Sequence, residues 1–340
     1  MSRCILVTGG LGYIGSHTVI QLMEAGDDVI CFDNLVNSKR AVLDRVHQVT
    51  GRRPIFIEGD IRDANTLQAA IDAHSIDGVI HFAGLKAVGE SVEKPLSYYD
   101  NNVTGTEVLL RVLATTTIRQ FVFSSSATVY GQPDVVPIPE SATLRPTNPY
   151  GRTKYFIEEM LRDLYRADPS WSISILRYFN PVGAHPSGLL GEDPNGIPNN
   201  LMPFISQVAV GRRAELSVFG NDYDTPDGTG VRDYIHVMDL ADGHLAALSH
   251  GKNRQGCFTF NLGTGTGYSV LDMLRAFEVA SQRPIPYAIV ERRAGDIGTC
   301  YADCQAAASE LDWTASRTLK EMTADTWRWQ SQNPNGYPST

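Results

Sequence analysis

The first half of the chain alternates short apolar runs with longer amphipathic stretches. The apolar runs span 4–7, 29–32, 55–57, 78–82 and 121–123, and turns rich in glycine or polar residues follow them. A short run without polar alternation is typical of a strand that is buried on both faces of a sheet. Strands that alternate with helical stretches favour a parallel sheet covered by helices on both sides. We therefore predict an α/β fold with a doubly wound parallel sheet.

A glycine-rich turn follows the first apolar run directly. Gly9, Gly12 and Gly15 recur at every third position, and an apolar-faced helix is expected from about 14 to 25. A dinucleotide pyrophosphate requires a tight turn, a close backbone approach and a helix amino terminus that points at the phosphate charge. Because a strand precedes this turn and a helix follows it, the pattern predicts a Rossmann-type dinucleotide site.

An acidic residue ends the second predicted strand. Asp33 stands there, roughly 20 residues after the glycines. A carboxylate at this position accepts hydrogen bonds from the ribose hydroxyls of adenosine and would repel a 2′-phosphate, so NAD is favoured over NADP. Lys39 and Arg40 follow shortly afterwards, and we interpret both as solvated charges.

The next two strand ends also carry candidate cofactor residues. Asp60 either accepts from the adenine amino group or caps the following helix, and the sequence leaves both readings open. Ala83 and Gly84 are small enough for close cofactor approach, and Lys86 could reach a ribose or a phosphate. His81, inside the strand, is interpreted as a hydrogen-bonded core histidine.

A tyrosine and a lysine four residues apart carry the candidate chemistry. Thr147 or Asn148 can cap a helix whose first turn contains Pro149, so Tyr150 and Lys154 share one helix face. A free tyrosine has a pKa of about 10. A nearby ammonium favours the phenolate and is expected to lower that pKa, so the pair could take a proton from a sugar or alcohol hydroxyl.

A serine-rich segment, 124–131, ends the fifth predicted strand. A hydroxyl at this strand end can hydrogen-bond the substrate oxygen that the tyrosine deprotonates. Neither this segment nor a Tyr-x-x-x-Lys pattern is specific alone. Together with the glycine turn and Asp33, in this order and spacing, they predict a dinucleotide-dependent enzyme that acts on a hydroxyl group.

A second glycine-rich segment, 263–267, lacks the dinucleotide spacing. Ser269 and Asp272 form a capping signal directly after it. We therefore predict an ordinary loop before a helix at this point.

Composition and charge narrow the function classes. The 340 residues carry a net charge of −9, which argues against nonspecific nucleic-acid binding. No apolar run is long enough to span a bilayer, and no signal peptide is expected. The five cysteines are odd in number and scattered, which suits a reducing cytoplasm. Cys300 and Cys304 lack a second ligand pair, so no metal site is expected.

Over essentially its whole length, the chain resembles the extended short-chain dehydrogenase/reductase family. Besides the motifs above, the resemblance is carried by the segments 81–91, 124–131, 177–184, 197–203 and 230–237. The sugar-binding segments are similar to those of members that epimerise nucleotide sugars.

The resemblance implies a role for each matching residue. Tyr150 would be the acid/base, Lys154 its electrostatic partner and ribose anchor, and Ser126 the hydrogen-bonding helper. NAD would be held by Gly9, Gly12, Tyr13, Ile14, Gly15, Asp33, Asn34, Asn37, Ser38, Asp60, Ile61, Phe82, Ala83, Gly84, Lys86, Asn101, Ser124, Tyr150, Lys154 and Phe179. A UDP-hexose would be held by Ser126, Tyr150, Asn180, Asn200, Leu201, Ser217, Val218, Phe219, Arg232, Arg293, Asp296 and Cys300. The arginine forks match phosphate oxygens bidentately.

The implied reaction is redox-neutral. Tyr150 takes the 4-hydroxyl proton while a hydride leaves C4, and the 4-keto sugar turns over and receives the hydride on its opposite face. UDP-galactose and UDP-glucose would be exchanged in this way. A nucleotide-sugar 4,6-dehydratase is the alternative, but related dehydratases carry an acid pair where this chain has Ala127 and Thr128. A non-catalytic NAD-binding regulator would be expected to lack the tyrosine or the lysine.

One position departs from many family members. Cys300 is much smaller than the tyrosine that can stand there, which leaves room beside the hexose C2. We hypothesise that UDP-GlcNAc and UDP-GalNAc are also interconverted. A neighbouring side chain that fills the space is the alternative, and the sequence leaves both open.

The expected architecture has two domains. Residues 1–180 would form the NAD-binding Rossmann domain, and some chain beyond 230 would return to it. Residues 181–340 would form the smaller α/β domain that binds the UDP-sugar. The site would lie in the cleft between them. Helices over about 103–115 and 152–167 carry extra apolar residues, and the family resemblance suggests that they pair across a homodimer.

Overall fold

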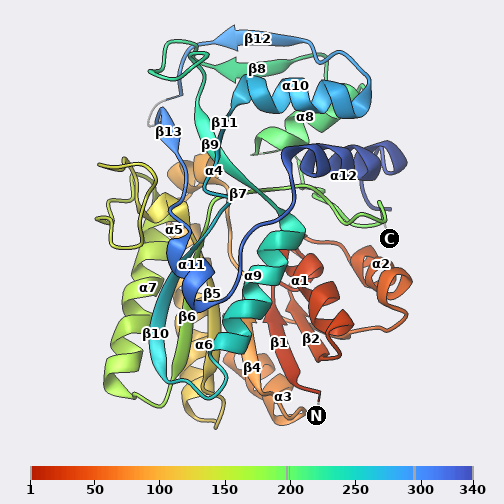
Figure 1. Cartoon of the computed structure of the whole chain (residues 1–340). Helices are drawn as coiled ribbons and strands as arrows, with labels where there is room; N and C mark the ends of the chain where they lie inside the picture. Colours follow the sequence, from red (N-terminus) through yellow and green to blue (C-terminus); the bar gives the residue numbers. More distant parts are fainter. Residues whose placement is uncertain (1, 197, 199, 294–295, 339–340) are drawn as a thin grey trace.

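A seven-stranded parallel sheet forms the centre of the protein (Figure 1). This computed structural model describes residues 2–196, 198, 200–293 and 296–338. The strand order is β10-β6-β5-β4-β1-β2-β3, and every pairing along it is parallel. The strands are β1 (Cys4–Thr8), β2 (Asp28–Asp33), β3 (Ile55–Glu58), β4 (Gly78–His81), β5 (Gln120–Ser126), β6 (Ser172–Tyr178) and β10 (Gly256–Leu262). The predicted doubly wound α/β fold is confirmed.

Helices cover both faces of this sheet. Successive strand side chains point to opposite faces, so Ile5 and Val7 of β1 join one core and Leu6 joins the other. The first core packs under α1 (Tyr13–Glu24), α2 (Ala41–Thr50) and α9 (Val237–His250). The second packs under α3 (Ala64–Asp72), α6 (Gly105–Ala114) and α7 (Pro149–Ala167). Burial on both faces explains why the strands appear as uninterrupted apolar runs in the sequence.

The strand order reverses between β1 and β4. β2 and β3 extend the sheet on one side of β1, whereas β4, β5, β6 and β10 extend it on the other. The connections leave this point in opposite directions, so a crevice opens at the carboxyl ends of β1 and β4. The glycine turn after β1 and residues 82–86 after β4 border this crevice.

Two predicted capping signals are confirmed. α7 begins at Pro149, and the side chain of its cap Asn148 accepts from the Gly151 amide at 2.8 Å. α10 (Val270–Ser281) begins with a reciprocal capping box between Ser269 and Asp272. The first cap sets the position of Tyr150 in the opening turn of α7.

Two other helix starts differ from expectation. Asp60 caps no helix, because Asp63 caps α3 and accepts from the amides of Asn65 and Thr66. The helix expected from about 103 is α6, which begins later, and a π-helix, Tyr99–Thr104, precedes it. In this wider turn the buried Asn102 accepts from the Leu85 amide at 2.8 Å and donates to the Leu85 carbonyl at 3.0 Å. Where Asn102 hydrogen-bonds the loop after β4, the chain thus forms a π-helical turn in place of regular α-helix.

A smaller layer lies beyond the carboxyl ends of the main sheet, in the upper part of Figure 1. β7, β11 and β13 each pair with β9, and β8 pairs with β12. Its elements are β7 (Asn180–Val182), α8 (Leu201–Ala209), β8 (Leu216–Phe219), β9 (Val231–His236), β11 (Gly267–Ser269), α10, β12 (Tyr287–Val290), β13 (Thr299–Cys300) and α12 (Leu319–Gln332). Between β9 and β11 the chain returns to the main sheet as α9 and β10. Ile197 and Asn199, from the segment 197–203 that carries the family resemblance, lie outside the described residues.

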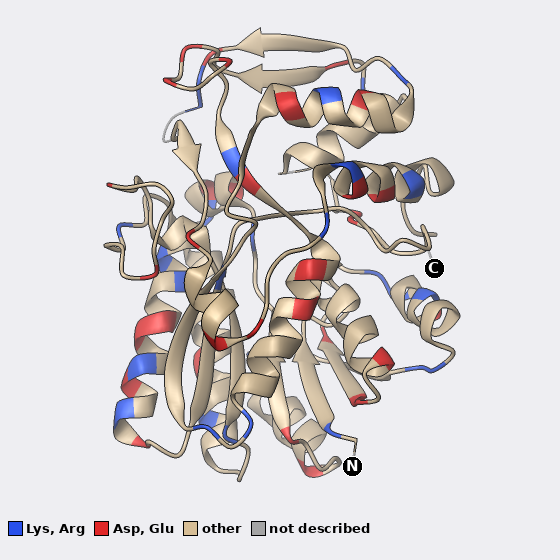
Figure 2. Ribbon diagram, in the orientation of Figure 1, with Lys and Arg blue, Asp and Glu red and all other residues tan. Residues whose placement is uncertain are grey.

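Four further short elements complete the described chain, and charges of both signs are mixed (Figure 2). They are α4 (Val88–Glu93), α5 (Pro95–Tyr98), the 3₁₀ turn Ala127–Val129 and α11 (Gln305–Glu310). Basic and acidic residues are interspersed along both layers (Figure 2). All five cysteines are free thiols. No helix within the described residues combines the length and apolar character that crossing a membrane requires.

Candidate active site

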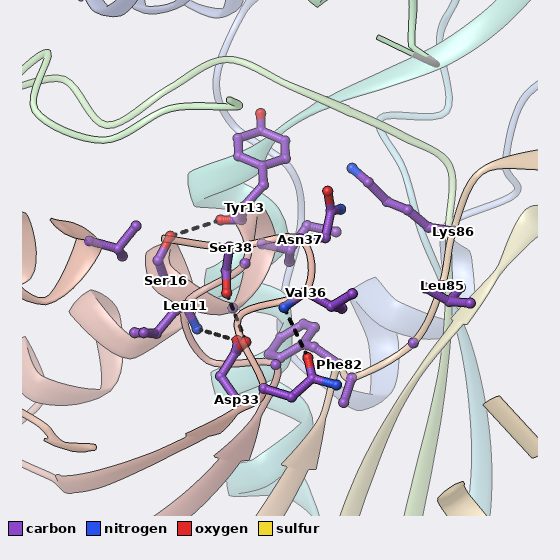
Figure 3. A pocket seen from close by; sticks show the side chains of 18 of the residues that line it. Leu11, Tyr13, Ser16, Asp33, Val36, Asn37, Ser38, Phe82, Leu85 and Lys86 are labelled. Atoms are coloured by element: carbon purple, nitrogen blue, oxygen red, sulfur yellow. Dashed lines mark hydrogen bonds between the residues drawn. The ribbon is translucent and has the colours of Figure 1, made fainter. Parts of the chain in front are cut away.

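A cavity occupies the crevice between β1, β2 and β4 (Figure 3). The residues that line it come from the glycine turn, the ends of three strands and the start of α7. Those expected from the sequence are Gly9, Gly12, Tyr13, Ile14, Gly15, Asp33, Asn34, Asn37, Ser38, Ile61, Phe82, Ala83, Gly84, Lys86, Asn101, Tyr150 and Lys154. Asp60, Ser124 and Phe179 are not part of the lining. The structure therefore brings most of the expected cofactor residues around one space.

The glycine turn is as tight as a pyrophosphate site requires. Gly9 has φ +68°, and a Cβ there would lie 2.8 Å from the Ala83 amide nitrogen. A Cβ at Gly15 would overlap the carbonyl oxygen of Gly9. α1 begins directly after Gly12, which has no side chain to cap the helix, so the first-turn amides remain available to an anion.

Asp33 is buried at the base of the cavity and is held by its own loop. Its Oδ2 accepts from the Leu11 amide at 3.0 Å and its Oδ1 from the Ser38 hydroxyl at 2.7 Å (Figure 3). Oδ1 also accepts from the Leu35 amide at 2.9 Å. A carboxylate offers about four acceptor sites, so capacity for a ribose hydroxyl remains. The glycine turn and this oriented carboxylate together fit the adenosine half of a dinucleotide.

Asp60 faces away from this lining. Its carboxylate accepts from Arg62 Nε at 2.9 Å, from Arg62 Nη2 at 2.7 Å and from Asn34 Nδ2 at 3.0 Å. The Arg62 guanidinium holds the pKa of this carboxyl well below its usual range. Since Gly59 and Ile61 do line the cavity, the backbone around Asp60, but not its carboxylate, contributes to the site.

Tyr150 and Lys154 reach the cavity from the first turns of α7. Both side chains are almost fully buried, at 6% and 5% exposure. Lys154 Nζ donates to the Ser124 carbonyl at 2.8 Å and lies 6.0 Å from the centre of the Tyr150 ring. The contribution of Ser124 is therefore this carbonyl, because its hydroxyl hydrogen-bonds the buried His244 at 2.7 Å.

Ser126 is oriented to donate to the phenol. Its Oγ accepts from the Thr128 amide at 3.2 Å and from the Thr128 hydroxyl at 3.0 Å. A serine hydroxyl has two acceptor sites and one proton. With both acceptor sites occupied, the proton is left for an outside acceptor, and a hydrogen bond from Ser126 lowers the pKa of Tyr150.

Burial nevertheless dominates the titration of both groups. It raises the pKa of Tyr150 to about 12, against the opposing effect of Ser126, and lowers the pKa of Lys154 to about 8. The expectation that Lys154 lowers the tyrosine pKa is wrong for the protein's own groups, because the ammonium donates to the Ser124 carbonyl and lies 6.0 Å from the centre of the tyrosine ring. Deprotonating Tyr150 thus needs positive charge brought to the cavity wall, where a cationic nicotinamide ring would bind.

The residues expected to hold a UDP-hexose lie in the smaller layer, apart from Ser126 and Tyr150. Asn180 begins β7, Leu201 begins α8, Asn200 precedes α8, and Arg232 and Cys300 are register partners on β9 and β13. Ser217, Val218 and Phe219 belong to β8, where the Val218 side chain is part of the core and can offer only backbone.

Arg292 and Arg293 lie shortly after the end of β12, and Arg293 is the one expected to hold the UDP-hexose. Arg293 lies over the Phe219 ring at 4.5 Å and donates to Asp296 at 3.0 Å. The neighbouring Arg292 lies 3.9 Å from the Tyr223 ring centre and donates to Asp222 at 2.6 Å. Both guanidinium groups are thus held by an aromatic ring and a carboxylate.

The sequence reasoning missed one wall of the cavity. Residues 191–194 and Tyr337 line it from the far half of the chain. Asp193 pairs with Lys39 at 2.6 Å, and Glu192 pairs with Lys86 at 2.9 Å. The interpretation of Lys39 as a solvated charge is therefore wrong. Arg40 is solvent-exposed as expected, and it pairs there with the exposed Glu58. No local pattern marks these partners, because more than a hundred positions separate each pair, 154 for Lys39 and Asp193 and 106 for Lys86 and Glu192.

Comparisons with known proteins return similar chains over nearly the full length. The family model described as GDP-mannose 4,6 dehydratase matches residues 6–326. The UDP-glucose 4-epimerase of Haemophilus influenzae is 60% identical over 334 residues, covering 98% of this chain and 99% of that protein. UDP-glucose 4-epimerase from Bifidobacterium longum, solved in complex with NAD+ and UDP, is 55% identical with a TM-score of 0.96, covering 98% of this chain and 100% of that one. The UDP-Glc/GlcNAc 4-epimerase from Campylobacter jejuni is 35% identical with a TM-score of 0.85, covering 97% and 100%.

Proposed function

Because this chain belongs to the UDP-glucose 4-epimerase family of extended short-chain dehydrogenases/reductases, we propose that it interconverts UDP-galactose and UDP-glucose at C4 with NAD as its cofactor. The observation that carries the proposal is the pair of Tyr150 and Lys154, buried at the wall of a dinucleotide-shaped cavity. The chain supplies a proton acceptor beside the position of a hydride acceptor, which is what oxidation of an alcohol carbon requires.

The proposed roles of the chain's own groups follow from this geometry. Tyr150 takes the proton of the 4-hydroxyl and returns one to the same oxygen after the sugar has turned. When bound, NAD supplies the hydride acceptor and donor for C4. Ser126 donates a hydrogen bond to the phenolate or to the sugar oxygen, and the Lys154 ammonium anchors a ribose and stabilises negative charge.

Retention of the cofactor is supported by the wall at 191–194. A redox-neutral cycle fails if the reduced cofactor leaves while the sugar is a ketone. Lys39 with Asp193 and Lys86 with Glu192 join this segment to both sides of the cavity. Glu192 also accepts from Asn200 at 3.0 Å, so the wall connects to the start of α8 on the substrate side.

We assign the uridine diphosphate to the smaller layer. Arg232 and Arg293 are proposed to hold the diphosphate, with Asn180, Asn200 and the start of α8 beside it. The division into an NAD-binding domain over 1–180 and a substrate domain over 181–340 is kept as a proposal, with α9 and β10 assigned to the first. Free thiols at all five cysteines support the proposed cytoplasmic location.

A 4,6-dehydratase is the competing function, because the matching family model carries that description. Its chemistry needs a carboxylic acid and a base beside the serine. Ala127 and Thr128 occupy those positions, and the Thr128 hydroxyl donates to Ser126. Neither residue is a carboxylic acid or a base, so these two positions cannot eliminate water across C5 and C6.

Proton NMR of the purified protein with UDP-galactose distinguishes the two functions. We expect UDP-glucose to form without added NAD, and we expect dinucleotide to be released when the protein is denatured. A 4-keto-6-deoxy sugar as product would establish the dehydratase instead. Bound NAD without any sugar conversion would contradict the proposed substrate.

The N-acetylated sugars give a test at Cys300. This thiol is nearly buried on β13, in a cluster with Tyr130 and Phe179. A Cys300→Tyr variant is expected to lose UDP-GalNAc conversion by at least about tenfold and to keep UDP-galactose conversion, because a phenol would fill space beside C2. Cys304→Ser, at the nearby thiol, is the matched control. Equal rates on the acetylated pair before and after Cys300→Tyr would end the hypothesis.

A homodimer is proposed across α6 and α7. Phe156 on α7 is 43% exposed and lies 6.1 Å from the Tyr99 ring. Exposed aromatic surface on the face beside α5 supports burial by a second copy. Sedimentation velocity should give twice the chain mass for the parent and a weakened dimer for Phe156→Asp. A parent that sediments only as a monomer would refute the pairing.

A further inference from the structure

A buried carboxylate lies directly behind the candidate catalytic lysine. Glu158 is one helical turn after Lys154 on α7 and is 0% exposed. It accepts from Ser125 Oγ at 2.6 Å, from Arg177 Nε at 3.0 Å and Nη2 at 2.6 Å, and from Arg162 Nη2 at 2.8 Å. These four bonds use the acceptor capacity of a carboxylate. The proposed reaction assigns Glu158 no role.

The partners of Glu158 come from several elements. Arg177 on β6 also donates to the Tyr130 hydroxyl at 3.1 Å and to the Glu140 carbonyl at 2.9 Å. Tyr130 in turn donates to Asn261 of β10 at 2.6 Å. Burying a charge pair is costly and is offset only when its remaining hydrogen bonds are satisfied, as they are here. Such a network holds its elements in one register.

The network is attached to the catalytic groups at β5. Ser125, bonded to Glu158, stands between Ser124, whose carbonyl accepts from Lys154, and Ser126, whose hydroxyl serves Tyr150. α7 and the end of β5 are therefore joined by two adjacent bonds. A shift of either bond would move the serine, the tyrosine and the lysine relative to one another.

Resting on the proposed epimerase function, we propose that Glu158 is a positioning residue, which fixes the end of β5 against α7 and keeps the Lys154 ammonium charged in its buried site. The protonated lysine donates to the Ser124 carbonyl and keeps further N–H donors for a ribose hydroxyl, which is its proposed role. A negative charge one turn away favours that form. Arg177 and Arg162 hold this charge in place without occupying the cavity.

Titration of the surrounding groups supports this assignment. Burial lowers the pKa of Lys154 to about 8, and Glu158 opposes that effect. Burial lowers the pKa of His81 on β4 to about 3 and raises that of Cys257 on β10 to about 11. The other groups around Lys154 and Glu158 also titrate outside the neutral range. Burial raises the pKa of Tyr98 on α5 and of Tyr178 on β6. Glu158 raises the pKa of Arg177, and the pKa of Tyr150 is about 12. Lys154 is thus the group of this cluster whose charge changes in the neutral to mildly alkaline range.

The sign of the effect follows directly. Activity needs the protonated lysine, so it falls as the pH rises through the pKa of Lys154. A Glu158→Gln substitution keeps the shape and removes the charge, which lowers that pKa. The alkaline limb of kcat is therefore expected to move to lower pH by about one unit, with KM for UDP-galactose little changed.

The experiment measures Lys154 directly as well as turnover. The chain has six lysines, so ¹³C-lysine labelling of the NAD-saturated protein gives few signals, and Lys154→Arg assigns the relevant one. Glu158→Gln should lower the measured Lys154 pKa by about one unit. Glu159→Gln, at the next position of α7 with an exposed side chain, is the matched control and should leave it unchanged. An unshifted Lys154 titration in folded Glu158→Gln protein would overturn the proposal.

A second variant covers the case in which Glu158→Gln does not fold. Arg162→Gln removes a partly exposed partner of Glu158 and leaves more of its negative charge uncompensated. The Lys154 pKa and the alkaline limb should then move upward, opposite to Glu158→Gln, and an unchanged or lowered value would contradict the proposal. The NMR titration needs no sugar, so failure of the epimerase assignment is seen separately, as a parent protein that does not convert UDP-galactose.

Discussion

A Tyr150→Phe variant is expected to lose about a thousandfold in kcat for UDP-galactose conversion while it still folds and binds NAD. The substitution removes one oxygen from a ring that is 6% exposed, and phenylalanine fills the same space. The Tyr150 amide keeps its bond to Ser91 Oγ at 3.2 Å, so the start of α7 is unchanged. The loss falls on the proton transfer because the substitution removes the proton acceptor that the proposed reaction requires.

The measurement is steady-state epimerisation by proton NMR, with bound NAD determined in parallel. Tyr155→Phe, on the same helix but away from the cavity lining, is the control and should behave as the parent. Retention of more than about a tenth of kcat by Tyr150→Phe would show that another group moves the proton. A parallel loss of NAD would show that the substitution acts through cofactor binding instead.

A Gly15→Ala variant is expected to lose cofactor binding altogether. The added Cβ would overlap the carbonyl oxygen of Gly9, and backbone cannot move aside as a flexible side chain can. The turn must therefore open, which displaces the α1 amides from the pyrophosphate position and destabilises the β1–α1 unit by about 1–3 kcal/mol or more. Since the redox step depends on NAD, turnover should be undetectable.

Calorimetric NAD titration and thermal unfolding check this expectation. Gly89→Ala on α4 is the matched control, because a Cβ there meets nothing within 4 Å. It should keep the parent affinity and melting temperature. Gly15→Ala protein that copurifies with stoichiometric NAD would contradict the assignment of this turn to the pyrophosphate.

Features that depend on neighbouring residues were predictable from the sequence. The strand runs at 4–7 and 29–32 became β1 and β2, and the caps at Asn148 and Ser269 begin α7 and α10. The glycine turn, Asp33 and the Tyr150–Lys154 pair line one cavity because parallel strands end at the same edge of a sheet. Each of these signals acts over a single turn, strand or helix start.

Features that depend on distant partners were not predictable. Asp60 was assigned to adenine or to a cap, yet Arg62 and Asn34 take its carboxylate. The expected helix start near 103 gave way to a π-helix because Asn102 bonds to the loop after β4. In both cases a specific side-chain contact outweighs a weak local preference.

The sequence by itself determined the parallel α/β fold, the place of the dinucleotide turn and the spacing of the tyrosine and lysine, because apolar periodicity, glycines and caps act locally. Only the tertiary structure decided what surrounds those groups. It paired Lys39 with Asp193 across 154 positions, brought Ser125 and Arg177 to the Glu158 carboxylate, and buried Tyr150 so that its pKa rises to about 12 instead of falling. Burial and ion pairing depend on which distant segments meet, and these interactions set the charge state of the candidate catalytic pair.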